Sequence, residues 1–180
     1  SKLIGVKVKK LTSGKYSFKA DKLELELLKS DKFITLSKSL RGSIMIVGPL
    51  LSRFGFGSIP RPGGDKIGRR RLDTHFESFK KLGAQFNYDK RESFFNVKAK
   101  KLKGCDILLD EASVTGTANI IMACVLAEGR TTIYNAACEP YLQQLCKLIN
   151  QMGGKIKGVG SNLLTIEGVD SLKGAKHRCL

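Results

Sequence analysis

The sequence has little of the chemistry that metal sites and disulfide frameworks require. Among its 180 residues are only two histidines, His75 and His177, which are far apart in the chain. The five cysteines are odd in number, and none forms a C-x-x-C pair. This usage indicates unpaired thiols in a reducing compartment, and we expect neither a metal site nor a cofactor. Cys124 and Cys146 lie in apolar helical patterns and are predicted to be buried.

Long apolar runs are also missing. The longest, 44–51, is far shorter than the roughly 20 residues that span a bilayer. The first residues lack the apolar region and cleavage site of a secretory signal. We therefore expect a cytoplasmic protein with no membrane partner, long enough for one domain with a full hydrophobic core.

Acidic residues are scarce, with 16 Asp and Glu against 32 Lys and Arg, which gives a net charge of +16. Such a charge favours an anionic partner. Many lysines flank apolar positions, as on solvated faces, but the arginines cluster at positions 53, 61, 69, 70 and 71. Arginine makes bidentate contacts with phosphate and carboxylate groups. A nucleic-acid-binding module stays an alternative, disfavoured because RNP motifs, helix-turn-helix spacing and zinc ligands are all missing.

An internal repeat organises the chain into two similar units, Arg41–Gly104 and Thr115–Gly174. Each is predicted to hold a helix, a strand, a second helix and a hairpin. The predicted elements are helices Ser43–Phe54 and Thr117–Glu128, strands Gly57–Pro60 and Thr131–Asn135, helices Asp73–Leu82 and Pro140–Met152, and hairpins 85–97 and 155–166. Gly55, Gly129, Gly83 and Gly153 are predicted to end the four helices, with Asp73 as an N-cap and Pro140 in a first turn.

The spacing within the two units differs at one place. Gly83 and Gly104 are 21 residues apart, as are Gly153 and Gly174, but the first unit has four extra residues around 63–68. A partial copy at 4–20 matches only the end of a unit. We therefore expect an α/β (α+β) fold of α-β-α-β-β units, divided into 1–35 (the tail of a first unit), 36–110 (the second unit) and 111–180 (the third).

The four extra residues fall in a loop, 61–73, that is rich in glycine and arginine. Pro62 fixes its own φ angle, and Gly63 and Gly64 permit backbone angles closed to other residues. Such a composition suits a shaped loop whose backbone approaches a ligand closely. A solvated basic surface loop is the alternative interpretation.

A series of short motifs resembles the UDP-N-acetylglucosamine enolpyruvyl transferases. The motifs, in the order of that family, are Arg41-Gly42-Ser43, Gly48-Pro49-Leu50-Leu51-Ser52-Arg53-Phe54-Gly55, Pro62-Gly63-Gly64, Ile67-Gly68, Arg70, Leu72-Asp73, Leu82-Gly83-Ala84, Ser113-Val114, Leu126-Ala127-Glu128-Gly129, Asn135-Ala136-Ala137 and Glu139-Pro140. The resemblance covers nearly the whole chain. Family members are about twice as long, so the chain corresponds to most of one of their two domains.

The resemblance implies both a fold and a reaction. The fold is an inside-out α/β barrel, with helices inside and sheets outside, and the second domain of the family is absent here. The reaction transfers enolpyruvyl from phosphoenolpyruvate to the 3′-hydroxyl of UDP-N-acetylglucosamine and releases phosphate. It commits the sugar nucleotide to peptidoglycan synthesis, and thus to cell wall biogenesis, cell shape, the cell cycle and cell division. The active site lies between the domains, so the isolated chain is expected to be inactive.

The resemblance also implies roles for particular residues. Asp65 stands where most members have a cysteine that acts as proton donor. Arg41 and Arg70 match arginines that hold the phosphate-bearing substrates. Two segments match those that bind the uridine nucleotide sugar, namely Arg70, Arg71, Leu72, Asp73 and Thr74, and Glu111, Ala112, Ser113 and Val114. In the alternative interpretation Arg41 is a surface charge, and Asp73 and Ser113 merely cap helices.

Two further positions depart from the family pattern. Arg71 replaces a proline, and Thr115 follows Ser113-Val114 where glycine is usual. The related enzyme that acts on shikimate 3-phosphate stays a second alternative. A truncated gene product that only folds is a third.

Because a carboxylate replaces the reactive thiol at position 65, epoxides of the fosfomycin type should not label the loop. Intact-mass and peptide mass spectrometry are expected to find no adduct on Asp65 after incubation. An adduct on Asp65 itself would contradict this prediction.

Overall fold

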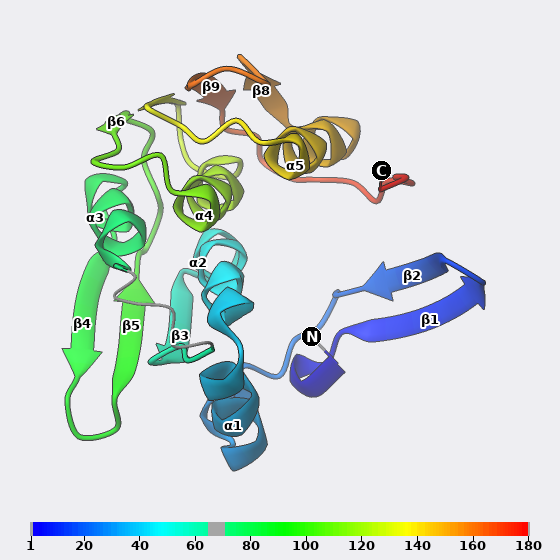
Figure 1. Ribbon diagram of the computed structural model, residues 1–180, viewed down its shortest axis with the longest axis vertical. Helices are drawn as coiled ribbons and strands as arrows, with labels where there is room; N and C mark the ends of the chain where they lie inside the picture. Colours follow the sequence, from blue (N-terminus) through cyan, green and yellow to red (C-terminus); the bar gives the residue numbers. More distant parts are fainter. Residues whose placement is uncertain (1, 65–70, 180) are drawn as a thin grey trace.

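The computed structural model describes residues 2–64 and 71–179 (Figure 1). The helices are η1 (Lys2–Ile4), η2 (Leu25–Lys29), α1 (Asp31–Ser39), η3 (Arg41–Ile46), α2 (Val47–Phe54), α3 (Asp73–Lys81), α4 (Val114–Cys124) and α5 (Pro140–Gln151), where η denotes a 3-10 helix. The strands are β1 (Lys7–Thr12), β2 (Lys15–Lys19), β3 (Phe56–Pro60), β4 (Gln85–Asp89), β5 (Phe94–Lys98), β6 (Asp106–Leu108), β7 (Arg130–Tyr134), β8 (Lys155–Lys157) and β9 (Leu163–Glu167). None of the helices in these ranges is long and apolar enough to cross a bilayer.

The strands form separate sheets that share one pattern. β1 and β2 make a two-stranded hairpin, and β3, β5 and β4 make an antiparallel sheet in that order. The last sheet has the order β6-β7-β9-β8, in which β6 pairs with β7 in parallel and the other pairs are antiparallel. In both larger sheets the second strand of the hairpin pairs with the strand that follows the first helix of its unit.

The helices lie inside and the sheets outside. In Figure 1, α2 and α4 run through the middle of the molecule, and the three sheets lie around them. α4 is buried at eight of its eleven positions, which fits a sequence that is apolar around most of its circumference. The resemblance therefore implied the correct fold class.

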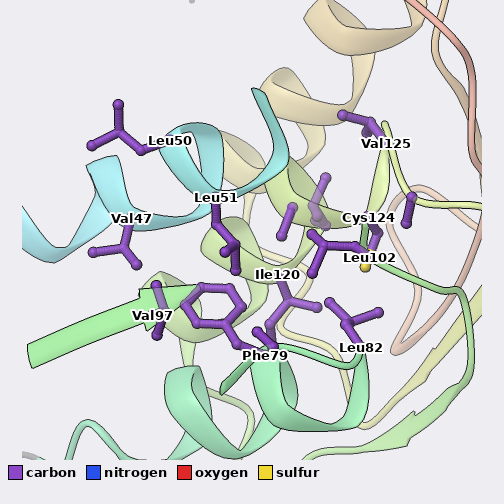
Figure 2. Close-up of a cluster of buried hydrophobic side chains, with 14 of the residues drawn as sticks. Val47, Leu50, Leu51, Phe79, Leu82, Val97, Leu102, Ile120, Cys124 and Val125 are labelled. Carbon is purple, nitrogen blue, oxygen red and sulfur yellow. The ribbon is translucent and has the colours of Figure 1, made fainter. Parts of the chain in front are cut away.

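The core forms where the central helices α2 and α4 meet the β3-β5-β4 sheet (Figure 2). Leu51 from α2, Phe79 from α3 and Ile120 from α4 are at most 1% exposed and lie in one apolar cluster. Cys124 and Cys146 are buried as well, as predicted from their apolar surroundings. Burial raises the pKa of the Cys124 thiol to about 12, so this sulfur packs as a neutral apolar group.

The repeat appears as matching backbone hydrogen bonds. Ala99 N donates to Gly55 O, and the equivalent Gly168 N donates to Gly129 O, both at 2.9 Å. Likewise Lys103 N donates to Leu82 O at 3.0 Å, and Lys173 N donates to Met152 O at 2.7 Å. The predicted order of helix, strand, helix and hairpin is thus confirmed in both units, as are Pro140 in the first turn of α5 and the left-handed Gly55, Gly83 and Gly153 after α2, α3 and α5.

Four predicted helix boundaries are wrong, one of them the start of α4, which lies at Val114 and not at Thr117. The first helix begins as the 3-10 helix η3, and its α-helical part starts only at Val47. Gly129 does not end α4, which stops at Cys124 because Glu128 pairs instead with the neighbouring segment: Glu128 N donates to Leu102 O, and Glu128 O accepts from Gly104 N. Asp73 is not the N-cap of α3, which is Leu72, because the Asp73 carboxylate pairs with Arg71.

α2 and α4 approach each other closely at Gly48. A Cβ atom on Gly48 would lie 2.3 Å from the backbone oxygen of Asn119 and 2.5 Å from its side-chain Oδ1. The Gly48 N–H donates to that Oδ1 at 2.7 Å. The absence of a side chain at position 48 therefore sets the distance between the two central helices.

Gly48→Ala tests this packing. Alanine favours a helix by about 1 kcal/mol over glycine, but the added methyl group would force α2 and α4 apart. We expect the free energy of unfolding in urea to fall by about 1–3 kcal/mol. Gly42→Ala is the matched control, because its Cβ would meet nothing closer than Leu40 Cγ at 3.9 Å. Equal stability of Gly48→Ala and the unmodified chain would contradict the prediction.

Candidate functional site

The site residues predicted from the resemblance lie on three segments. Arg41 begins η3, Asp73 and Thr74 begin α3, and Ser113 and Val114 begin α4. Arg71 and Leu72 directly precede α3, and Glu111 and Ala112 lie between β6 and α4. Asp65 and Arg70 fall outside the ranges that the structure describes, so their predicted roles stay predictions.

Thr74 joins the second and third segments. Its side-chain Oγ1 donates to Asp110 Oδ1 at 3.1 Å and lies 3.4 Å from Glu111 Oε1. Thr74 is only 4% exposed, so its hydroxyl group serves this contact rather than facing solvent. A Cβ atom on Gly116 would lie 3.1 Å from Thr74 Cγ2, which shows how closely α4 approaches α3 here.

Arg71 lies between two carboxylates on the surface. Its Nε donates to Asp73 Oδ2 at 2.8 Å, and its Nη1 lies 3.0 Å from Asp110 Oδ2. The hydrogen bond with Asp73, together with the charges of Asp73 and Asp110, raises the pKa of Arg71. The side chain that replaces the family's proline thus carries a charge that two neighbours balance.

Arg41 connects the first segment to this pair, since its Nη2 donates to the backbone oxygen of Arg71 at 2.9 Å. The predicted residues Arg41, Arg71, Thr74 and Glu111 are therefore linked by contacts, although they come from three places in the sequence. The resemblance implied that these residues act together, and the fold brings them together.

Ser113 has the capping role that the sequence left open as an alternative. Its Oγ accepts a hydrogen bond from Gly116 N at 3.2 Å, and its backbone oxygen accepts one from Thr117 N at 2.8 Å. The N–H groups in the first turn of a helix have no intrahelical partner, and the helix dipole is positive at that end. Capping therefore places the positive end of α4 next to Ser113 and is compatible with a binding role for the residue.

Two clefts lie on either side of the Arg71–Asp73 pair. One, of about 300 Å³, is lined by three arginines, two carboxylates and four aromatic rings, namely Arg41, Arg61, Arg71, Asp73, Glu77, Phe76, Phe86, Tyr88 and Phe95. The other, of about 290 Å³, is lined by Arg71, Asp73, Thr74, Lys81 and Asp110. Guanidinium groups around a cleft suit phosphate or carboxylate groups, and a cleft with an aromatic wall also suits a flat ring.

His75 is a residue of this region that the sequence interpretation missed. It follows Thr74, is 1% exposed, and was considered only as a metal ligand. Its Nε2 lies 3.4 Å from Thr115 Oγ1, and its Nδ1 lies 3.1 Å from Asn119 Nδ2. Burial, with a smaller effect from the nearby Arg41 cation, lowers the pKa of His75 from 6.5 to about 4.

Asn119 and Asp110 were missed as well. Asp110 stands directly before the predicted Glu111 segment, and Asn119 is an amide in the apolar run of α4. A fully buried amide needs hydrogen-bond partners, so its presence in an apolar helix was a signal that polar groups meet there.

Comparison with known proteins identifies the family. The model of the EPSP synthase (3-phosphoshikimate 1-carboxyvinyltransferase) family matches residues 2–180. The chain belongs to this family. UDP-N-acetylglucosamine 1-carboxyvinyltransferase of Bacteroides fragilis is 59% identical over 177 residues, which are 98% of this chain and 41% of that protein. The enzyme of the same name from Porphyromonas gingivalis is 58% identical over 177 residues, again 98% of this chain and 41% of that protein.

Solved structures of the EPSP synthase family agree in fold. EPSP synthase from Acinetobacter baumannii superimposes with a TM-score of 0.67 at 17% identity, covering 96% of this chain and 38% of that one. The enolpyruvyl transferase NikO from Streptomyces tendae gives a TM-score of 0.65 at 14% identity, covering 93% and 38%. The chain thus spans about two fifths of the length of the relatives it matches, and family membership favours the transferase prediction over the nucleic-acid alternative.

The buried His75 predicts an acid-sensitive contribution to stability. Between pH 6.5 and 4 the unfolded chain binds a proton that the folded ring does not, so stability is lost as pH falls through this window. The slope is about 1.4 kcal/mol per pH unit, for a total on the order of 3 kcal/mol.

Urea unfolding at pH 7 and pH 4.5 measures this contribution. His75→Gln should unfold with a smaller difference between the two pH values, because the titration of the carboxylates is common to both proteins. An unchanged pH dependence in His75→Gln would mean that the ring is already protonated in the folded chain or accessible to solvent.

Proposed function

We propose that this chain is the larger part of one domain of an enzyme that transfers enolpyruvyl from phosphoenolpyruvate to the 3′-hydroxyl of UDP-N-acetylglucosamine. Relatives with that enzyme name are 51–59% identical to the chain, and this similarity carries the proposal. The same enzyme name implies a place at the first committed step of peptidoglycan synthesis, in the cytoplasm.

The geometry of the three linked segments supports a site for a phosphorylated sugar. Arg41 and Arg71 reach the same cleft, and Thr74 connects them to Glu111 and to the capped start of α4. UDP-N-acetylglucosamine carries a diphosphate, which needs cationic and N–H donors, and a uracil ring, which needs a flat apolar surface. Both kinds of group line this region.

The reaction proceeds by addition and then elimination. The methylene carbon of the enol gains a proton, its neighbouring carbon becomes electrophilic, and the sugar hydroxyl loses a proton as the new C–O bond forms. The resulting methyl group then loses a proton as the bond to phosphate breaks, which restores the carbon–carbon double bond and releases phosphate. In this proposal the Asp65 carboxyl group takes the place of the family's cysteine as proton donor, and Arg41 and Arg70 balance the charge of the phosphate groups. The group that accepts the sugar proton belongs to parts of the family's enzymes that lie beyond this chain.

The first hairpin supports the inference that the domain is incomplete in this chain. Almost every residue of β1 and β2 is exposed, including Phe18 at 67% and Tyr16 at 51%, whereas β4 and β5 have β3 beside them and α3 against them. An open hollow of about 1200 Å³ next to this hairpin is lined by apolar side chains such as Phe18, Phe54 and Met152, and by charged ones such as Arg53 and Lys101.

We infer that the helix, strand and helix that would complete the first unit cover this surface. Residues 1–35 would then be the tail of that unit, 36–110 the second unit with its loop at 61–73, and 111–180 the third. A second domain of the same enzyme would close the active site.

Isothermal titration calorimetry tests which of the two candidate substrates binds. UDP-N-acetylglucosamine should bind the chain and shikimate 3-phosphate should not, because the diphosphate and uracil match the arginine-lined, aromatic-walled cleft. Arg41→Ala should weaken binding about tenfold through the loss of a charge-assisted contact. Arg53→Ala is the matched control: its Nη2 also donates to a backbone oxygen, that of Ala20, at 2.9 Å, but it lies outside both clefts.

A phosphate-release assay with both substrates tests completeness. We expect no turnover by the 180-residue chain, since its site lacks the partner domain. Sustained turnover would overturn the inference that the site is incomplete, and preferential binding of shikimate 3-phosphate would assign the chain to the other branch of the family.

A further inference from the structure

A group of polar side chains crosses the apolar core where the central helices meet. Asn119 lies in the middle of α4 and is 0% exposed, and His75 of α3 is 1% exposed. Their contacts reach the backbone of η3 and α2, and the hydroxyl group of Thr115 at the start of α4. Burying such groups costs free energy unless their hydrogen bonds are made, so their partners show what they hold in place.

The partners of Asn119 fix the orientation of its amide. Its Oδ1 accepts from Gly48 N at 2.7 Å, and its Nδ2 donates to Ile44 O at 2.9 Å. The second N–H of the same Nδ2 points to His75 Nδ1 at 3.1 Å. Both donors of the amide are thus used, and the acceptor is used by a backbone N–H, which excludes the flipped arrangement.

The orientation of the amide determines the tautomer of His75. Because Asn119 donates to Nδ1, this ring nitrogen carries no proton, and the proton of the neutral ring lies on Nε2. Nε2–H then donates to Thr115 Oγ1. A protonated ring would direct an Nδ1–H toward the Nδ2 group of the Asn119 amide, so that two hydrogen-bond donors would face each other.

The outer partners in this group of hydrogen bonds, Ile44 and Thr115, lie close in sequence to residues of the candidate site. Ile44 belongs to η3, which starts at Arg41. His75 follows Asp73 and Thr74 in the first turn of α3, and Thr115 follows Ser113 and Val114 at the start of α4. The three segments that carry the candidate site are therefore joined beneath the surface by one set of hydrogen bonds.

We propose that His75 is a positioning residue: as the neutral Nε2–H tautomer, it links Thr115 to Asn119 and so holds the Arg41, Asp73–Thr74 and Ser113–Val114 segments at the spacing that a sugar nucleotide requires. The proposal deepens the proposed function and rests on it for the identity of the ligand. It also gives a role to Thr115, whose hydroxyl group is the acceptor that a glycine at this position would lack.

The charges around the ring agree with a neutral histidine. α4 carries no charged side chain, and Arg41 of η3 acts on the ring as a cation that disfavours a second positive charge. Asp73, two residues before His75 on its own helix, is instead paired with Arg71 at the surface.

Three threonine variants of α4 separate positioning from general stability. Thr115→Val removes the acceptor of His75 Nε2–H with little change in shape, and Thr115→Ser keeps it. Thr117→Val is the matched control: Thr117 is 0% exposed, two residues further along the same helix, and its Oγ1 accepts from Ala137 N at 3.0 Å on a different side. Each variant is compared with the unmodified chain for melting temperature, imidazole 15N shifts and UDP-N-acetylglucosamine affinity.

We expect the 15N shifts of His75 at pH 7 to show the Nε2–H tautomer in the unmodified chain, in Thr115→Ser and in Thr117→Val. Thr115→Val should disturb this signature and weaken UDP-N-acetylglucosamine binding by about threefold to tenfold, whereas Thr115→Ser should bind within about twofold of the unmodified chain. Thr117→Val should lower the melting temperature and leave the affinity within about twofold.

Several outcomes would overturn the proposal. These are an Nδ1–H tautomer in the unmodified chain, an unchanged affinity in Thr115→Val, or an equal loss of affinity in Thr117→Val. If the unmodified chain binds no UDP-N-acetylglucosamine, the proposed function fails. The positioning role of His75 is then tested by the backbone amide resonances in a 1H–15N NMR spectrum. Thr115→Val should then shift the amide resonance of Gly48, which Asn119 connects to His75, and an unmoved Gly48 resonance would show that the three segments are not linked.

Discussion

The close approach of α2 and α4 is the constraint on which the rest of the structure depends. Gly48 leaves room for the backbone and side chain of Asn119, and the Gly48 N–H donates to the Asn119 amide. This contact fixes the two central helices relative to each other, and the sheets pack around them. It also orients the Asn119 Nδ2 group toward Ile44 and His75. The packing of the two helices therefore determines which polar groups Asn119 contacts.

The candidate site is built outward from that contact. η3 places Arg41, α3 places Asp73 and Thr74, and α4 places Ser113 at its N-cap. At the surface, Arg71 is balanced by Asp73 and Asp110, whereas Arg41 and Arg61 line the adjoining cleft with their positive charge. The site thus combines fixed helix ends with arginines, an arrangement suited to phosphate groups because a preorganised cationic surface does not need to reorganise when an anion binds.

The repeated unit explains how one fold provides both the scaffold and the site. The two units share the hydrogen bonds of their glycine turns and of their last loops, as at Lys103 with Leu82 and Lys173 with Met152. The first unit differs by the arginine-rich loop between β3 and α3, and two of its described residues, Arg61 and Arg71, line the same cleft as Arg41. Duplication thus supplies the packing, and the insertion in one copy carries residues to which the proposed function assigns substrate contacts.

The sequence by itself determined the order of helix, strand, helix and hairpin in the two units, the repeat, the buried cysteines and the family, because apolar periodicity, glycine positions and short motifs are local properties of the chain. It predicted neither α1 nor β6. It misplaced the start of α2, the end of α4 and the cap of α3, since those boundaries depend on partners such as Leu102 and Arg71 that are distant in sequence or compete for the same side chain. The roles of Asn119, Asp110 and His75 were decided only by the tertiary structure. A buried polar side chain is defined by the groups that the fold brings to it, and no local pattern records which groups those are.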